Sequence, residues 1–275
     1  MIKYLLLPYY MNRITIKNDS LIVVSEDGNK KEKIEIKPND ISFDRIILFP
    51  FSGYISFKAI TFLIENKIFV LFLDRYGNLK SELHPIIYPF RASDIKKNQY
   101  LMNDSMKMHL SKEIIKGKIK KQKEFLEGLE ENWNIDSFLE KIEQSATKKR
   151  VLGIEAGVTK QYWERYKKYI NPDYEFRERT GRKKGLSHPK NAKDKFNSLL
   201  NFSYSLLAGE ITRACYGTGF DVYKGFFHKE EMGFKPFVYD VIEPFRFLSE
   251  RACLSLSFDK DLLRKGFYKD REGSF

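Results

Sequence analysis

Short apolar runs separated by turn residues fill the first part of the chain, and this pattern predicts a β-rich region. The runs are rich in β-branched and apolar residues, and we expect strands at Tyr4–Leu7, Arg13–Ile16, Leu21–Val24, Lys33–Ile36, Asp44–Phe49, Lys67–Leu73 and Leu79–Leu83. The apolar spacing becomes helical once, after Ser56, which is placed to cap a helix that buries Leu63. Asp74 follows a strand, and its carboxylate is expected to cap a turn.

Helical spacing of apolar residues begins at about residue 92 and continues to the end of the chain. It predicts helices from Ser93 towards Leu126, from Trp133 to Gln144, from a start near Glu155 through Tyr166, from Phe196 to Ala214, and over Val238–Arg251. We expect the segment His84–Pro89 to link the two regions. The fold class is therefore α+β, with an N-terminal β-rich domain containing one helix over residues 1–88, followed by a larger all-α catalytic domain over residues 89–275.

Positive charge is unevenly distributed along the chain. The 275 residues carry a formal net charge of +12, to which residues 1–90 contribute +2 and the remainder +10. Lysines recur between Lys112 and Lys123, and the stretch 177–195 is also strongly basic. Such segments are either solvated surface or contacts for the phosphates of a nucleic acid, and composition leaves both interpretations open. In the second case the contacts would come from Lys120, Lys121, Arg179, Arg182, Lys183 and Lys184.

The cysteines and the apolar segments predict a cytoplasmic protein. Cys215 and Cys253 lie in apolar surroundings without CxxC spacing, as expected for reduced core thiols. The apolar run at the N-terminus is too short for a signal peptide, and no stretch approaches the length of a membrane span. We therefore expect no membrane partner.

One histidine and two carboxylates stand close together near the end of the chain. His228 lies among aromatic and glycine residues, and Asp240 and Glu243 follow in a predicted helix, where i and i+3 positions share a face. Carboxylates with one imidazole suit Mg²⁺ or Mn²⁺. This pattern predicts a site for one hard divalent cation. The other histidines are expected in the linker, on a helix surface and in a loop: His84, His109 and His188.

Two further segments contain polar residues that would complete such a site. Glu155 lies between two glycines, and its carboxylate either complements a helix N-terminus or faces a ligand. Asn197, Asn201 and Tyr204 form a polar stripe along a predicted apolar helix. They either support a metal ligand or bind backbone groups, and the sequence leaves this choice open.

Four segments, in this order, resemble the CRISPR-associated integrase family Cas1. They are Gly-Ile-Glu-Ala-Gly at 153–157, NSLLNFSYSLL at 197–207, GFDVYKGFFH at 219–228 and YDVIEPFR at 239–246. Residues 48–77 are similar to the N-terminal β domain of that family, so the resemblance covers almost the whole chain. It implies that the metal ligands and catalytic residues are Glu155, His228 and Glu243, with Asp240, Asn197, Asn201 and Tyr204 near the site.

The resemblance implies a metal-dependent DNA endonuclease and integrase of spacer acquisition in prokaryotic antiviral defence. Such an enzyme inserts short DNA fragments into the CRISPR repeat array by attack of a 3′-hydroxyl on a phosphodiester, with Mg²⁺ or Mn²⁺ as cofactor. The resemblance also implies double-stranded DNA as a partner, a homodimer whose β domains meet, and the small partner protein Cas2.

Two other functions are compatible with the same residues. A metal-dependent nuclease of DNA repair, or one acting on branched DNA, would use the same three ligands. Alternatively, the chain is an inactive DNA-binding assembly subunit that has lost its chemistry with a C-terminal extension, since relatives usually continue beyond the position of Phe275.

Overall fold

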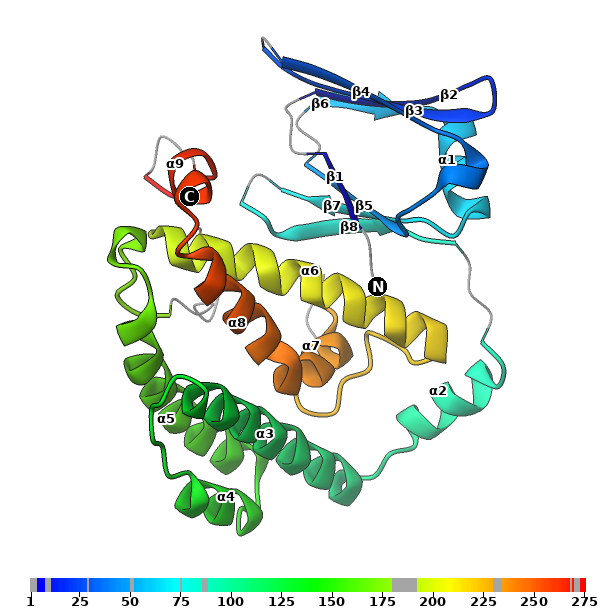
Figure 1. Cartoon of the computed structure of the whole chain (residues 1–275). Coiled ribbons are helices and arrows are strands. Elements are labelled where there is room, and N and C mark those ends of the chain that lie inside the picture. The colour runs from blue at the N-terminus through cyan, green and yellow to red at the C-terminus, as the bar shows by residue number, and fades with distance from the viewer. Residues whose placement is uncertain are drawn as a thin grey trace. The chain divides into compact units, whose positions relative to one another are not determined.

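The structure is a computed structural model that describes residues 4–7, 11–28, 30–49, 52–74, 76–85, 89–179, 192–229, 234–267, 269 and 273–275. The chain divides into two compact units, Met1–Ile87 and Tyr88–Phe275. The first unit is rich in strands and the larger second unit is helical (Figure 1), which confirms the predicted α+β class.

Two four-stranded sheets form the first unit. One sheet has the order β1 (Tyr4–Leu7), β5 (Arg45–Leu48), β7 (Phe69–Leu73) and β8 (Leu79–Leu83), in which only the β7–β8 pair is antiparallel. The other has the order β4 (Lys30–Ile36), β3 (Ser20–Asp27), β2 (Met11–Lys17) and β6 (Ser52–Ile55). Helix α1 (Phe57–Glu65) contributes to a core that both sheets share, and a 3₁₀ helix, η1, spans Pro38–Asp40.

The predicted strands, the helix cap at Ser56 and the turn at Asp74 are all present in this unit. Each expected strand is present, and α1 begins after Ser56, whose Oγ accepts a hydrogen bond from the Ala59 N–H at 3.2 Å. Asp74 Oδ1 accepts hydrogen bonds from the N–H groups of Tyr76 and Asn78, both at 2.9 Å, so it caps its turn.

Like the 3₁₀ helix η1, strand β6 is an element of this unit that the sequence pattern does not predict. Its Gly53 has a φ of 117°, and a Cβ at this position would lie 1.8 Å from the Asn12 carbonyl oxygen. The strand therefore requires glycine at a position where the pattern of strands calls for a larger side chain.

Helices form the second unit. They are α2 (Ala92–Tyr100), α3 (Asp104–Glu127), α4 (Asp136–Glu143), α5 (Lys148–Tyr166), α6 (Lys195–Thr218), α7 (Pro236–Ile242), α8 (Arg246–Leu256) and α9 (Lys260–Lys265), with 3₁₀ turns η2 (Lys167–Tyr169), η3 (Pro172–Tyr174) and η4 (Glu243–Phe245). Helix α3 packs against α5 and η4, and α6 packs against α7 and α8 (Figure 1). None of the described helices is long and apolar enough to cross a membrane.

Aromatic side chains fill the core of this unit. Tyr162, Trp163 and Tyr166 of α5 lie with neighbouring ring centroids 5.1 to 5.5 Å apart, and Trp133 packs against Tyr162 at 6.1 Å. Phe196 at the start of α6 meets Tyr166 at 5.9 Å. All five are buried, so this cluster fixes α5 against α6.

The helix predicted from Ser93 towards Leu126 is two helices. Helix α2 follows Arg91, whose φ of 63° marks a turn, so Ser93 is not its cap. Asn103 begins α3, because its side-chain oxygen accepts a hydrogen bond from the Met106 N–H at 2.8 Å. The apolar spacing continues across residues 101–103, and only the capping asparagine signals the break.

Two further helix predictions need correction, and both concern candidate site residues. Glu155 is not at a helix start: α5 begins at Lys148 after the capping Thr147, so Glu155 lies in the helix interior. The helix predicted over Val238–Arg251 is interrupted at Glu243–Phe245 by η4, where Pro244 has no N–H to donate.

Candidate active site

Two glutamates from separate elements meet at one lysine. Glu155 Oε1, on α5, pairs with the ammonium of Lys118, on α3. Glu243 Oε2, on η4, lies 2.9 Å from the same Nζ. The packing of α3 against both α5 and η4 creates this meeting point. The three side chains are only 8, 18 and 7% exposed for Lys118, Glu155 and Glu243, so the cluster is shielded from water.

Burial and charge act in opposite directions on this cluster. Burial alone would raise the pKa of Glu243, but Arg246 and Lys118 outweigh it and hold that pKa well below its usual value. Burial would also lower the pKa of Lys118, but Glu243 and Glu155 outweigh it and raise that pKa. At neutral pH the glutamate is therefore an anion and the lysine a cation.

His228 is held by Asp240. The carboxylate of Asp240 is fully buried and accepts hydrogen bonds from the N–H groups of Phe226, Phe227 and His228 at 2.6, 3.0 and 2.8 Å. Its Oδ1 also lies 2.7 Å from His228 Nδ1. A carboxylate on Nδ1 leaves Nε2 as the nitrogen available to a ligand.

The predicted ligands thus form two pairs in the structure. Glu155 and Glu243 meet at Lys118, and His228 is fixed by Asp240. Asp240 and Glu243 are three residues apart but face different partners. Across the described residues no three His, Cys, Asp or Glu side chains are grouped closely enough to hold a metal ion.

The donor chemistry nevertheless suits a hard divalent cation. Glu243 Oε2 is buried and lacks a hydrogen bond of good geometry, since the nearby ammonium contacts it only as an ion pair. Two carboxylates and one imidazole are ligands that Mg²⁺ or Mn²⁺ accepts.

A second polar network supports Glu243 from behind. Arg246 NH2 lies 2.9 Å from Glu243 Oε1, and its guanidinium stacks over the Tyr204 ring at 4.8 Å. The Tyr204 hydroxyl donates a hydrogen bond of 2.7 Å to Glu250, a buried carboxylate that also accepts one of 2.6 Å from Tyr162. Burial raises the pKa of Glu250, while the two hydroxyls oppose that shift. The orientation of Glu243 therefore depends on side chains of α6 and α8.

The polar stripe on α6 extends this network. Asn197 and Asn201 accept hydrogen bonds of 2.6 and 2.9 Å from Arg179, whose guanidinium also lies over the Tyr204 ring, at 5.4 Å. The Tyr204 ring thus contacts two guanidinium groups, those of Arg179 and Arg246. The stripe binds side chains, and Asn197 also donates to the Glu178 carbonyl oxygen at 2.9 Å. The contact with the Glu178 carbonyl oxygen fits the backbone-binding interpretation, whereas support of a metal ligand stays a prediction.

The remaining predicted DNA contacts fall in three places. Lys120 and Lys121 are exposed on α3, where Lys121 pairs with Glu124 at 2.7 Å. Arg179 is half-buried and directed towards the two asparagines. Arg182, Lys183 and Lys184 lie outside the described residues, as does His188.

The sequence interpretation missed the specific roles of Lys118, Arg246 and Glu250. Lys118 belongs to a lysine run that suggested a solvated helix face, yet its neighbours Ile115 and Ile119 are buried. Lys118 comes three residues after Ile115 and one before Ile119, which places it on the core face of the helix. This spacing was the available signal. No comparable signal marks Glu250.

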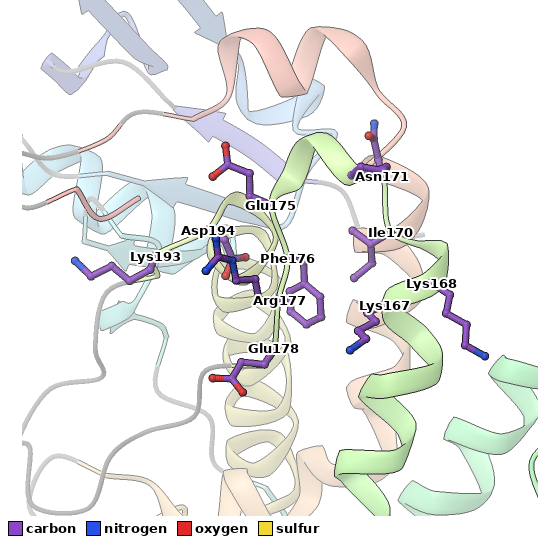
Figure 2. A pocket seen from close by; sticks show the side chains of 11 residues that line it. Lys167, Lys168, Ile170, Asn171, Glu175, Phe176, Arg177, Glu178, Lys193 and Asp194 are labelled. Atoms are coloured by element: carbon purple, nitrogen blue, oxygen red, sulfur yellow. The ribbon is translucent and has the colours of Figure 1, made fainter.

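A separate pocket of the helical unit has lining side chains of both charge signs (Figure 2). Its basic residues are Lys167, Lys168, Arg177 and Lys193, and its acidic residues are Glu175, Glu178 and Asp194. Glu155, His228 and Glu243 are not among its lining residues. We therefore do not assign the chemistry to this pocket.

The exposed face of α5 next to Glu155 leads to a prediction about stability. A Cβ added at Gly153 or Gly157 would meet no atom within 4 Å. Since alanine favours a helix interior more than glycine does, Gly153→Ala and Gly157→Ala should each raise the free energy of unfolding by about 0.5–1 kcal/mol. Denaturant titration of each variant measures this change.

Gly219→Ala is the matched control. Gly219 ends α6 with a φ of 90°, and a Cβ there would lie 2.9 Å from Ala92 Cα, so this variant should lose stability. A loss of stability in Gly153→Ala would show instead that another part of the protein covers this face of α5 in solution.

Comparison with known proteins agrees with the fold and with the predicted family. A model of the family described as CRISPR associated protein Cas1 matches residues 7–275. CRISPR-associated endonuclease Cas1 1 of Archaeoglobus fulgidus is 31% identical over 252 residues, which cover 83% of this chain and 70% of that protein. CRISPR-associated protein Cas1 3 of Methanobrevibacter ruminantium is 26% identical over 256 residues, covering 86% and 72% respectively.

Solved structures share the arrangement. A casposase bound to its integration product superposes with a TM-score of 0.86 at 25% identity, over 98% of this chain and 77% of that chain. A Cas1 protein from Thermotoga maritima gives 0.74 at 18% identity, over 98% and 83%. A chain of a Cas6-RT-Cas1–Cas2 complex gives 0.72 at 19% identity, over 98% and 29%.

An α+β fold of this kind places the chain in a class of proteins that includes named CRISPR-associated endonucleases and a casposase. Within that class, the chain belongs to the Cas1 family of CRISPR associated proteins.

Proposed function

We propose that this chain is a metal-dependent DNA endonuclease and integrase of CRISPR adaptation. The observation that carries the proposal is the convergence of Glu155 and Glu243 on one cation position, in the same helical unit as a histidine whose ring is oriented by a buried carboxylate. The reaction would be attack of the 3′-hydroxyl of a short DNA fragment on a phosphodiester of the repeat array. We propose that it takes place in the prokaryotic cytoplasm as part of antiviral defence.

Glu155, His228 and Glu243 would hold the Mg²⁺ or Mn²⁺ ion. When bound, such an ion neutralises charge on the scissile phosphate and makes the attacking oxygen more acidic. Asp240 holds Nδ1 of His228, so that Nε2 is the nitrogen available as a ligand. Arg246 remains paired with Glu243 Oε1, which directs Oε2 to the shared cation position.

DNA would bind through its phosphates, and its affinity would fall steeply with salt. Lys120 and Lys121 are exposed on α3, the same helix that carries Lys118, and are proposed as contacts. Arg179 is proposed with Arg182, Lys183 and Lys184 on the strength of the basic sequence 177–195. A homodimer that meets through the β-rich units, and Cas2 as a partner, are proposed from family membership.

A strand-transfer assay tests the proposal. Purified protein, with and without Cas2, is incubated with a labelled short duplex and a supercoiled plasmid that contains a repeat, in Mg²⁺, Mn²⁺ or EDTA. Joining of the label to the plasmid is expected with either metal and not with EDTA. His228→Ala should reduce joining by about 10³-fold or more, because the site loses a ligand.

His109→Ala is the matched control, since this histidine is exposed on α3. It should join DNA at the wild-type rate. Cleavage without joining would favour a nuclease of repair or of branched DNA. Binding of DNA without either reaction, at every metal concentration, would favour an inactive assembly subunit.

A further inference from the structure

The ammonium of Lys118 lies between two carboxylates and makes the kind of contact that a metal ion makes. It contacts one carboxylate oxygen of Glu155 and lies 2.9 Å from one of Glu243, and these oxygens come from separate elements. The lysine side chain is 8% exposed, so the ammonium has exchanged most of its water for carboxylate oxygens. A hard divalent cation binds the same kind of oxygen.

The hydrogen bonding of the cluster is incomplete on the side of Glu243. Glu243 Oε2 is buried, and its contact with the ammonium is an ion pair without good hydrogen-bond geometry. Glu155 Oε1, by contrast, also accepts a hydrogen bond of 2.9 Å from Thr159 Oγ1. Glu243 Oε2 therefore has the Lys118 ammonium as its contact in the cluster, and a divalent cation could take the place of that ammonium.

We propose that the ammonium of Lys118 occupies the divalent cation's position in the metal-free protein and that the cation must displace it to bind. Lys118 is then a positioning residue that keeps two like charges together before the metal arrives. It also competes with the metal and thereby weakens metal affinity. The inference rests on the proposed function, in which Glu155 and Glu243 are metal ligands.

Electrostatics supports both parts of the inference. Two carboxylates without a cation between them would repel each other in a site shielded from water, so a resident ammonium preserves their geometry. The same ammonium cannot share its position with a dication, because two cations in contact at a buried site repel strongly. Metal binding therefore includes the free energy of moving Lys118 away from the two carboxylates.

The test compares Mn²⁺ affinity in the full-length wild type and in Lys118→Met, using the electron paramagnetic resonance signal of free Mn²⁺. Methionine has a similar length and no charge, so the dissociation constant for Mn²⁺ should fall at least tenfold. The midpoint of thermal unfolding should be lower in Lys118→Met without metal and should rise more on Mn²⁺ addition than that of the wild type.

Lys116→Met is the matched control. Lys116 lies on the same helix and also pairs with two glutamates, Glu113 and, at 2.8 Å, Glu143, which are 49 and 63% exposed. Its replacement makes the same change in charge and should leave the Mn²⁺ dissociation constant within twofold of the wild-type value.

The outcomes separate this inference from the proposed function. Suppose that wild-type Mn²⁺ binding depends on Glu155 and Glu243, but Lys118→Met binds Mn²⁺ no more tightly than the wild type. That result would overturn the role of Lys118 and leave the metal site standing. Wild-type binding that is absent, or unchanged in Glu155→Gln and Glu243→Gln, would overturn the metal site itself.

Lys118→Arg keeps the inference testable if Lys118→Met does not fold. Arginine retains the charge, and its planar fork can hold both carboxylates with several donors. We expect it to weaken Mn²⁺ binding at least threefold. Binding as tight as that of the wild type would contradict competition between this side chain and the metal.

Discussion

Replacing Asp240 with alanine is expected to lower the free energy of unfolding by about 3–5 kcal/mol. The carboxylate is fully buried and accepts hydrogen bonds from three consecutive backbone N–H groups, those of Phe226, Phe227 and His228. Alanine would leave these three N–H groups buried without acceptors. Each group hydrogen-bonds to water in the unfolded chain, so each would then add an uncompensated desolvation cost to folding. Chemical denaturation followed by far-ultraviolet circular dichroism measures the change.

Asp259→Ala is the control for this prediction. Asp259 also accepts hydrogen bonds from two backbone N–H groups, those of Asp261 and Leu262 at 2.9 Å, but it caps the exposed start of α9. Water replaces a lost acceptor there, so the cost should be about 1 kcal/mol. Equal losses in both variants would show that the Asp240 carboxylate is not buried in solution.

Glu243→Gln is expected to lower the free energy of unfolding by about 3 kcal/mol or more at pH 7, since it removes one partner from a buried group of charges. Glutamine leaves Arg246 without its carboxylate and leaves Lys118 with Glu155 alone. As a proposed metal ligand, this residue should also be needed for strand transfer. Denaturant titration and the joining assay measure the two effects separately.

The stability loss in Glu243→Gln should depend on pH in one direction. The pKa of Glu243 is lowered by Arg246 and Lys118 despite its burial, from a model-peptide value of 4.5. The wild-type advantage is therefore fully present above pH 4.5 and declines as the pH falls below it. The matched control is Glu124→Gln, which removes an exposed pair with Lys121, in which the two side chains are 60 and 46% exposed, and should change stability little at any pH. A difference independent of pH would contradict an ionised Glu243.

The sequence was sufficient to predict strands, the fold class and the family, because these depend on local patterns and on ordered motifs. Ser56 and Asp74 act through neighbours within four residues, and such signals are visible in a sequence. The break between α2 and α3 was missed because apolar spacing continues through it. The 3₁₀ turn at Glu243–Phe245 was also missed, although Pro244 marks the place where the helix loses a donor.

The site itself depends on contacts between distant residues. Lys118 meets Glu155 and Glu243 because three elements pack together, and nothing near Lys118 in the sequence specifies these partners. The link from Glu250 through Tyr204 to Arg246 joins α8 to α6, because Glu250 and Arg246 are both on α8 and Tyr204 is on α6. Residue types and family motifs predict candidate ligands, whereas packing alone decides which cations and hydroxyls surround them.

Both tryptophans of the chain, Trp133 and Trp163, belong to the aromatic core of the helical unit. The β-rich unit has tyrosine and phenylalanine but no tryptophan. Intrinsic fluorescence excited at the red edge of protein absorption therefore reports on the helical unit alone. If the fluorescence transition coincides with the loss of the β-sheet signal in circular dichroism, the two units unfold as one cooperative body. If it does not, the unit that carries the proposed ligands can be followed by an optical signal of its own.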